Sequence, residues 1–404
     1  MVINTLLTHC LLALSVVGSL AAPPLPPAET ELAPLRIPKQ ANRLLKDQYI
    51  VVLKQDQPGK VEIKDQAIRR GIKHIYSIEN NFKGYAGKFD KEALEKIRSD
   101  PLVKYVEHDA QVTTQDVQSG APWGLARISH REPLTGGTND KYIHDPSGGT
   151  GITAYVIDTG IDIQHPEFEG RAKWGATFAS DGDVDGNGHG THVAGTIGSK
   201  TYGVAKKANL VAVKVLNAQG SGTYSDVIAG INWAANDAKN NGANKSVANM
   251  SLGGGASDSV DEAVNSAVDS GLHMAVAAGN SNDDACKYSP ARASKAIGVA
   301  ASDSRDQKAS FSNHGKCVHI IAPGVQVLST WTNGGTKSIS GTSMASPHIA
   351  GLIAYFLSIE PRDPAAMKEF LRSVAVKDAI RGFNTVTPNY LGFNNNQGSL
   401  RRMA

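Results

Sequence analysis

Three residues stand where secondary-structure elements begin or end, and their side chains could together hydrolyse an acyl bond. Asp158 follows the apolar stretch 154–157 and precedes a Thr-Gly turn, which places a carboxylate at the carboxyl end of a buried strand. His189 lies where a glycine-rich loop runs into an apolar helix, and Ser343 stands at the start of another apolar, periodic stretch. A hydroxyl nucleophile, an imidazole base and an orienting carboxylate are the components of nucleophilic acyl transfer.

Each of these residues also has an ordinary structural explanation. A lone Asp-Thr-Gly is typical of an aspartate that caps a turn, and a serine at a helix start is typical of an N-cap. His192 competes with His189, but it lies inside the helix, where we expect it to be packed or hydrogen-bonded. For Ser343 the functional alternative is that free N–H groups and the helix dipole stabilise an oxyanion when its hydroxyl attacks a carbonyl.

The glycine-rich loop also contains two partial metal-binding patterns. His189 and His192 lack the intervening glutamate and the four-residue spacing of a zinc protease. Residues 181–186 (DGDVDG) match the opening of an EF-hand calcium loop, but the twelfth position of that loop is His192 instead of a bidentate glutamate. We therefore expect no metal ion to be bound by this loop.

Apolar stretches that alternate with helical patterns occupy the chain from residue 151 onward. Such stretches are typical of parallel strands covered by helices on both faces, so we predict an α/β fold with a mostly parallel sheet. The predicted strands include residues 152–157, 210–216 and 273–278. Reactive groups gather beyond the carboxyl ends of such strands, where Asp158 lies.

A smaller unit precedes this sheet. Its pattern predicts a β-α-β-β-α-β order, which is the split βαβ arrangement of a small α+β domain. The charged stretch 61–70 lies between the first two strands, and Pro101 closes the second helix. The predicted elements are strands at 49–53, 74–78, 85–89 and 103–106, and a helix at 91–97.

The N-terminus predicts export. The apolar run 11–20 is too short to span a bilayer and ends in small residues, and the proline cluster 23–27 disfavours the alternative of a buried helix. We interpret residues 1–21 as a cleaved secretory signal. No later stretch predicts a transmembrane helix, and a net charge of +3 with both signs interspersed gives no reason to expect a nucleic-acid or membrane partner.

Cysteine usage fits an exported protein. Of the three cysteines, Cys10 lies in the signal, so the exported chain keeps Cys286 and Cys317. An oxidising compartment favours one disulfide between them, and two separate buried thiols are the alternative.

Three motifs resemble the signatures of the subtilase family of serine proteases. They are VIDTG at 156–160, HGTHVAG at 189–195 and GTSMASPH at 341–348. Their Asp, His, Ser order is that of subtilisin and differs from the Ser, Asp, His order of α/β-hydrolases. The stretches 121–129 and 391–394 resemble the proteinase K and cerevisin branch, so the resemblance covers nearly the whole chain beyond the signal.

The resemblance implies a serine endopeptidase that works through an acyl-enzyme and needs no cofactor. It makes Ser343 the nucleophile, His189 the general base and Asp158 the group that orients the ring, and it gives the Asn280 amide a role in binding the oxyanion. Small, uncharged wall residues imply a roomy primary pocket for aliphatic or aromatic side chains, beside strands that pair with an extended peptide. The implied substrate-binding residues are Gly220, Ser221, Gly222, Ser251, Leu252, Gly253, Gly254, Ala277, Ala278 and Gly279.

The N-terminal domain resembles the inhibitor propeptide of subtilases, which implies that it assists folding and blocks the active site until it is removed. We expect self-cleavage between residues 113 and 118. The predicted organisation is a signal at 1–21, a propeptide at 22–115 with an inhibitor-like domain at about 48–113, and a peptidase domain at 116–404. The expected partners are protein and peptide substrates and the chain's own propeptide, and we expect a monomer.

The sequence departs from proteinase K relatives at two positions. Val193 replaces a cysteine that several relatives carry, so no thiol is expected beside the active site. An aspartate that ligates a structural calcium in proteinase K is replaced by His319, and we therefore expect little stabilisation by calcium at that site. By contrast, Cys286 and Cys317 match a disulfide of aqualysin-like members, which implies that they are bonded.

Two sequons occur. Asn244 lies in a polar loop and is the expected glycosylation site, whereas Asn249 enters a substrate-flanking strand and is expected to be inaccessible.

Two other functions compete with the peptidase prediction. A catalytically silent subtilase could serve as a binding or inhibitory module, but the intact catalytic set disfavours it. An esterase on an α/β-hydrolase fold needs Gly-x-Ser-x-Gly, which residues 341–345 do not match. The expected destination is extracellular, with a vacuole-like compartment as the alternative, because residues 401–404 contain no retention signal.

Overall fold

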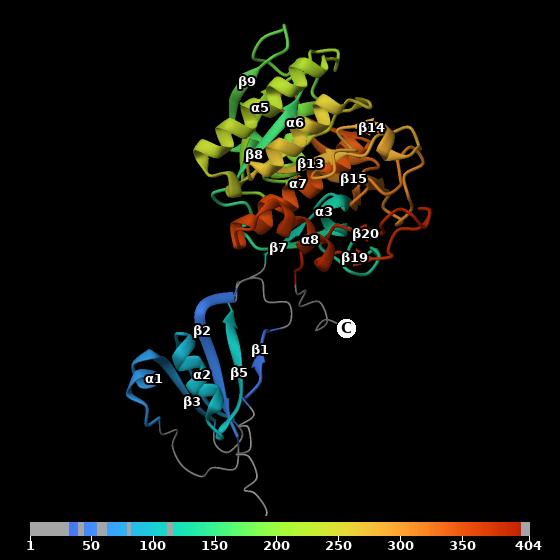
Figure 1. The fold of residues 1–404 in the computed structure, drawn as a ribbon. Helices are drawn as coiled ribbons and strands as arrows, with labels where there is room; N and C mark the ends of the chain where they lie inside the picture. The colour runs from blue at the N-terminus through green and yellow to red at the C-terminus, as the bar shows by residue number, and fades with distance from the viewer. Residues whose placement is uncertain (1–31, 39–43, 55–62, 79–81, 111–115, 397–404) are drawn as a thin grey trace, which may run out of the picture. The chain divides into compact units, whose positions relative to one another are not determined.

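The computed structural model describes residues 32–38, 44–54, 63–78, 82–110 and 116–396. They form two compact units: the smaller holds most of the described residues up to Asp109, and the larger holds all of those from Ala110 onward (Figure 1). The predicted signal at 1–21 lies outside the described residues, as do residues 113–115 of the predicted cleavage segment.

The smaller unit has the predicted βαββαβ order, preceded by one additional short strand. Its sheet has the strand order β1-β5-β2-β4-β3. Helix α2 begins after Asp90, whose carboxylate accepts from the N–H of Ala93 at 2.8 Å, and its apolar face places Leu94 and Ile97 in the core of the unit. The elements are β1 (Leu35–Arg36), β2 (Leu44–Leu53), α1 (Gln66–Gly71), β3 (Ile72–Ile78), β4 (Phe82–Lys88), α2 (Lys91–Ser99) and β5 (Val103–Ala110).

The main sheet of the larger unit has nine described strands in the order β19-β20-β16-β15-β13-β11-β8-β10-β9. Its neighbouring strands are parallel except for the pair β19 and β20, so the α/β prediction is confirmed. The strands are β8 (Thr153–Asp158), β9 (Ala172–Thr177), β10 (Asn209–Lys214), β11 (Ser246–Met250), β13 (His273–Ala277), β15 (Ile297–Ser302), β16 (Ile320–Pro323), β19 (Val376–Lys377) and β20 (Tyr390–Leu391).

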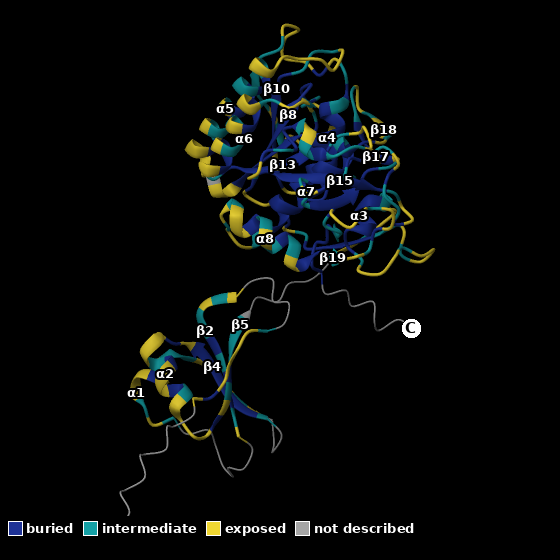
Figure 2. Cartoon of the chain, turned by 45° about the vertical axis from the view of Figure 1, so that its right-hand side comes forward, coloured by how far each residue is buried: buried dark blue, intermediate teal, exposed yellow. Residues whose placement is uncertain are grey.

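Helices cover both faces of this sheet because alternate strand residues are apolar on both sides. Along β8, Ala154 and Val156 pack with helices α4 and α7, whereas Tyr155 and Ile157 pack with α5 and α6. Figure 2 shows α5 and α6 with an exposed outer side. The helices are α3 (Trp123–Arg127), α4 (His189–Gly198), α5 (Tyr224–Asn241), α6 (Asp258–Asp269), α7 (Thr342–Ile359) and α8 (Pro364–Val374), with 3-10 turns at Pro166–Phe168, Ala243–Lys245 and Ala285–Lys287.

Three short strand pairs complete the described part of the larger unit. They are β6 (Asp116–Ser119) with β7 (Lys141–His144), β12 (Gly254–Gly255) with β14 (Tyr288–Ser289), and β17 (Val327–Trp331) with β18 (Gly335–Ile339).

Helix α7 corrects one expectation from the sequence. It is long and apolar enough to cross a membrane, although no such stretch was predicted. Most of its residues are buried inside the unit, where they pack against β11, β13 and β15, so its composition reflects a central core helix (Figure 2).

Candidate active site

The carboxyl ends of four strands meet at one edge of the main sheet. Strand β8 lies between β10 and β11, so the strand order reverses direction at β8, and crevices for ligands form at such points. The register places Asp158 opposite Lys214 of β10 and Ile157 opposite Met250 of β11, which in turn pairs with Val276 of β13. Residues that follow these strands are therefore brought to a common edge.

Asp158 and His189 are hydrogen-bonded at this edge. His189 Nδ1 lies 2.7 Å from Oδ1 of the fully buried Asp158. Because a carboxylate can only accept, Nδ1 must donate, and Nε2 of the neutral ring is left with its lone pair. The N–H of Thr159 donates to the same Oδ1 at 2.8 Å. The carboxylate thus fixes both the ring orientation and the tautomer.

The two histidines of the loop-helix junction have different environments. Burial disfavours the charged form of His189, but the carboxylates of Asp158 and Asp185 outweigh burial, and the pKa of His189 is raised above its ordinary value. His192 is fully buried, its Nε2 lies 3.0 Å from two main-chain carbonyls, and burial lowers its pKa to about 4. The expectation that His192 is packed and hydrogen-bonded is confirmed.

Ser343 is the second residue of α7. Its Oγ donates to the main-chain carbonyl of Ser251 at 3.1 Å, and no hydrogen bond joins it to His189 in the part of the chain that the structure describes. The Ser251 hydroxyl donates back to the carbonyl of Ser343 at 2.7 Å. The Asn249 side chain donates to Ser251 Oγ at 2.9 Å and accepts from Ser346 Oγ at 2.7 Å, so the end of β11 is cross-linked to the first turns of α7.

Asn280 follows β13, and its amide orientation is fixed. Its Oδ1 accepts from the main-chain N–H of Thr342 at 2.8 Å and from the Thr342 hydroxyl at 2.9 Å. A main-chain N–H can only donate, so the atom that faces it must be the oxygen, and Nδ2 points the other way. A Cβ built on Gly341 would lie 3.5 Å from the N of Ser343 and 3.6 Å from Asn280 Nδ2, so these two donors border the same space.

Sequence reasoning did not assign a role to Asp185 or Thr159, and both support the site. The buried Asp185 carboxylate accepts five hydrogen bonds, including those of the Thr159 and Thr191 hydroxyls. Thr159 Oγ1 also accepts from the N–H of Gly190 at 2.9 Å, which ties the turn after Asp158 to the start of α4. The Asp-Gly-Asn-Gly sequence could have indicated this role, because aspartates in such loops accept from nearby N–H groups.

Asn313 is a second supporting residue that the sequence did not reveal. It is fully buried, donates to the carbonyl of Ala278 at 2.9 Å and accepts from two N–H groups that follow Asn280. Gly279 has φ 103°, and a Cβ there would lie 2.4 Å from Asn313 Nδ2, so both the backbone and the space require glycine. Asn313 therefore holds the turn that carries Asn280.

Two cavities border these residues. Ser343 and Asn280 border a cavity of about 270 Å³, and none of its 13 lining residues is charged. His189 borders a second cavity of about 430 Å³, and Leu252, Gly253 and Ser289 line both. All ten residues that the resemblance assigned to substrate binding line one or both of these cavities.

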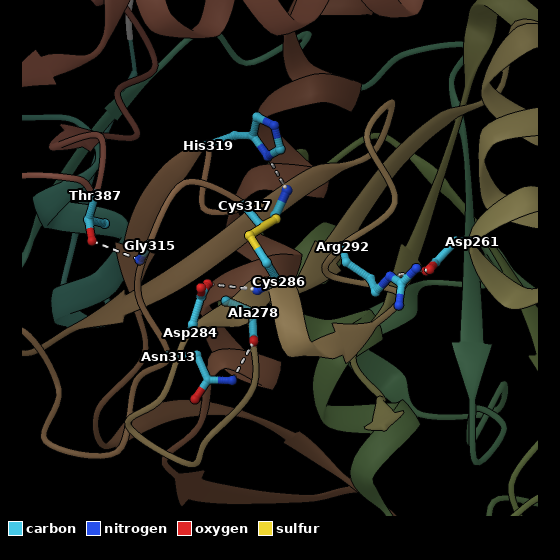
Figure 3. The surroundings of a disulfide bond; sticks show 11 residues. Asp261, Ala278, Asp284, Cys286, Arg292, Asn313, Gly315, Cys317, His319 and Thr387 are labelled. Carbon is cyan, nitrogen blue, oxygen red and sulfur yellow. Dashed lines mark hydrogen bonds and ion pairs between the residues drawn. A yellow bond between two sulfur atoms is a disulfide. The ribbon is translucent and has the colours of Figure 1, made fainter. Parts of the chain in front are cut away.

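Cys286 and Cys317 form a disulfide, as the resemblance implied (Figure 3). His319, two residues further on, is half-buried, and its Nδ1 accepts from the N–H of Gly298 at 3.0 Å. Because that N–H can only donate, the ring is held neutral, and burial lowers the pKa of His319 to about 3.

The calcium site implied by the family does not fit these residues. A hard cation needs oxygen ligands, and a neutral imidazole already committed to Gly298 supplies none. In addition, the Lys368 ammonium donates to the carbonyls of Ser294 and Ala296 at 2.9 and 3.2 Å, and Lys368 and Arg372 both help to lower the pKa of His319. Two protein cations therefore lie near the position where a carboxylate and a calcium ion would be needed. No cluster of three or more His, Cys, Asp or Glu that could hold a metal ion is found among the described residues.

The two sequons differ in exposure. Asn244 is exposed in the turn before β11, whereas Asn249 is fully buried and both ends of its amide are hydrogen-bonded.

An acid hydrogen-bonded to an imidazole where the strand order of a parallel α/β sheet reverses, together with a serine at the start of a helix packed against the same sheet, is the arrangement of a subtilisin-like serine peptidase. Comparisons agree: residues 149–399 match the model of the subtilase family, and residues 48–115 match that of the peptidase inhibitor I9 family. The chain belongs to the subtilase family and is a serine-type endopeptidase made with an I9 inhibitor propeptide.

Its relatives include fungal proteases. The chain is 52% identical over 350 residues to the subtilisin-like serine protease Pen c 2 of Penicillium citrinum, covering 80% of this chain and 77% of the relative. It is 50% identical over 350 residues to alkaline protease 2 of Aspergillus fumigatus, covering 80% and 71%. A crystal structure of a cold adapted subtilisin-like serine proteinase matches with a TM-score of 0.64 and 47% identity, covering 68% of this chain and 99% of that one.

Proposed function

We propose that this chain is a secreted endopeptidase of broad specificity that processes its own precursor, with catalysis carried out by Ser343, His189, Asp158 and Asn280. The observation that carries the proposal is the 2.7 Å bond between His189 and Asp158, at the end of the sheet where Ser343 of α7 is bonded to Ser251, which follows β11. In the resting enzyme the Ser343 hydroxyl donates to Ser251, and we infer that it turns toward His189 Nε2 when a substrate binds.

The reaction begins when Ser343 Oγ attacks the substrate carbonyl carbon while His189 Nε2 takes its proton. The buried Asp158 carboxylate stabilises the imidazolium that forms, consistent with the raised pKa of His189. His189 then gives the proton to the leaving amine, and the C–N bond breaks to leave an acyl-enzyme on Ser343. Water, deprotonated by His189, attacks the acyl carbon, and the proton returns to Ser343 as the acid product leaves.

Negative charge develops on the carbonyl oxygen in both steps. We assign the space beside Gly341 to this oxyanion, because Asn280 Nδ2 and the N–H of Ser343 both border it. The positive end of the dipole of the 18-residue helix α7 adds to the stabilisation.

Substrate specificity follows from the two cavities. An extended peptide that lies between residues 220–222 and 251–254 would pair with both segments through its backbone, which gives little side-chain selectivity. The smaller cavity takes the side chain before the scissile bond, and its uncharged lining, which includes Leu252 and Tyr288, favours an aliphatic or aromatic side chain.

Self-processing and export complete the proposal. Strand β6 begins at Asp116 and pairs with β7, so a cut at or just before Asp116 would leave this strand pair intact as the start of the mature enzyme. The N-terminal signal directs the precursor out of the cell, with a vacuole-like compartment as the alternative, and the exposed Asn244 would accept a glycan there.

The test compares the wild type with Ser343→Ala, with peptidase activity and the N-terminus of each product measured side by side. We expect an active wild type that starts near Asp116 and an inactive, uncut Ser343→Ala precursor. If both proteins fold and neither cleaves peptides, the proposal fails and a silent binding module becomes the better explanation.

A further inference from the structure

Lys214 is a fully buried lysine at the end of β10, directly opposite Asp158 in the parallel ladder. Its neighbours Val213 and Val215 belong to the apolar cluster under α5 and α6. Burial of an ammonium ion is costly unless its protons are hydrogen-bonded and its charge is paired. A lysine at this point therefore needs specific partners.

The structure provides three partners for the ammonium. Lys214 Nζ donates to the carbonyl of Thr159 at 2.9 Å and to the carbonyl of Leu216 at 2.8 Å, and it lies 3.2 Å from Asp181 Oδ1. The other carboxylate oxygen of Asp181 accepts from the N–H of Ala218 at 2.7 Å. The ammonium thus makes two hydrogen bonds to main-chain carbonyls, and its charge is paired with a carboxylate at the rim of the unit.

The first partner belongs to the turn that sets the position of Asp158. The N–H of Thr159 donates to Asp158 Oδ1, and the Thr159 hydroxyl bridges Asp185 and the N–H of Gly190. When Lys214 fixes the Thr159 carbonyl, it fixes the Thr159–Gly160 peptide unit and so holds Thr159, whose N–H donates to Asp158 and whose hydroxyl binds the helix end that presents His189.

The second partner belongs to the substrate-binding edge. Leu216 lines the cavity that His189 borders, and its N–H donates to the carbonyl of Asp158 at 3.2 Å. The Lys214 ammonium thus bonds on one side to the turn after Asp158 and on the other to the segment that leads to residues 220–222.

We propose that Lys214 is a positioning residue of the reaction, which holds the Asp158 turn and the Leu216 segment in the alignment that the bond between Asp158 and His189 requires. This inference rests on the catalytic roles proposed above. Lys214 is not one of the reacting groups, and it acts through the carbonyls of Thr159 and Leu216.

The competing explanation is that Lys214 only stabilises the fold, and the pH profile separates the two. The groups that face His189 are Asp158 of β8 and Asp185 of the preceding loop, with His192 nearby on α4. Both carboxylates raise the pKa of His189, so a loosened bond to Asp158 lowers it, and the acidic limb of kcat/KM moves to lower pH while kcat falls. A loss of stability alone would leave the limb in place.

The experiment compares Lys214→Met and Asp181→Asn with the wild type, using a peptide substrate across a range of pH. Lys295→Met serves as the matched control, since it also removes a lysine from an ion pair with an aspartate, but on the surface just before the amino end of β15, whereas the site lies beyond the carboxyl ends of the strands. We expect Lys214→Met to lower kcat by about 10²-fold, with a smaller change in KM, because small misplacements of catalytic groups have costs of this size. Asp181→Asn should give a smaller loss in the same direction, and Lys295→Met should match the wild type.

A spectroscopic readout keeps the test valid if Lys214→Met is not processed. In full-length precursor that carries Ser343→Ala, the low-field proton resonance of His189 Nδ1–H reports its bond to Asp158, and we expect it to move upfield when Lys214→Met or Asp181→Asn is added. An unchanged resonance, or an unchanged kcat and acidic limb with only a lower melting temperature, overturns the proposal. A limb that moves to higher pH with kcat retained also overturns it, because Lys214 would then act through charge alone. Activity of the wild type in the same assay tests the proposed function separately.

Discussion

Substitutions of Asn280 can separate transition-state stabilisation from folding stability, because the oxygen and the nitrogen of its side-chain amide have different functions. Its Oδ1 caps the N–H of Thr342 at the start of α7, and its Nδ2 borders the space beside Gly341. In Asn280→Ala both ends are lost. In Asn280→Asp the acceptor for Thr342 is kept, while the donor becomes a negatively charged acceptor.

The expected magnitudes follow from these roles. Loss of one oxyanion donor costs about 10²–10³ in kcat, or about 3–4 kcal/mol, with little change in KM because the bond strengthens only as charge develops. Loss of the cap costs about 0.5–2 kcal/mol of stability. Asn280→Ala should therefore lose both activity and stability, whereas Asn280→Asp should keep a melting temperature near that of the wild type and lose at least as much kcat.

The assay is steady-state hydrolysis of a peptide substrate at a pH above the raised pKa of His189, with active enzyme counted by titration and unfolding followed by calorimetry. A kcat for Asn280→Asp within about tenfold of the wild type would refute the reasoning, since one donor is expected to contribute more than that. So would a variant whose loss is confined to KM, because the amide would then bind the ground state and the transition state equally.

Three further outcomes are expected. His192 and His348 are buried, and burial lowers the pKa of each to about 4. Between about pH 6.5 and 4 the unfolded chain binds protons on these rings and the folded chain does not, so the free energy of unfolding should fall by about 1.4 kcal/mol for each ring and each pH unit as the pH is lowered. Denaturant titrations that show no such loss would contradict this. Replacing Cys286 and Cys317, which are 31 residues apart, by serine should lower the stability of the mature enzyme by about 3–4 kcal/mol, as calorimetry of the variant can check. Because the residues around His319 do not fit calcium, adding calcium should shift the melting temperature by less than about 2 °C. A rise of several degrees that His319→Ala abolishes would show that the site does bind calcium.

Structural features that depend on residues close together in the sequence could be predicted from the sequence. Buried parallel strands were read from apolar runs such as 273–278, and the strand-end position of Asp158 was read from the Thr-Gly turn that follows it. The βαββαβ unit was predicted because each of its strands and its second helix has its own periodicity. The apolar character of α7 was also visible, but only its burial showed that it is a core helix.

The hydrogen-bond partners that hold the site together could not be predicted in the same way. In the sequence, Lys214 is one polar residue in an apolar stretch, yet in the structure its ammonium donates to the carbonyl of Thr159, 55 positions away. In the sequence, Asn313 resembles an ordinary loop asparagine, yet in the structure its side-chain amide donates to the carbonyl of Ala278, 35 positions away.

By itself, the sequence determined the fold class and the family, and it singled out the residues that we propose carry the chemistry, because apolar periodicity, turn residues and the three motifs are local. Only the tertiary structure showed that the Ser343 hydroxyl donates to the carbonyl of Ser251 and that the amide orientation of Asn280 is fixed by Thr342. These are contacts between segments 92 and 62 residues apart, and their partners are mostly main-chain groups, which every residue carries and which no side-chain pattern can identify before the chain has folded.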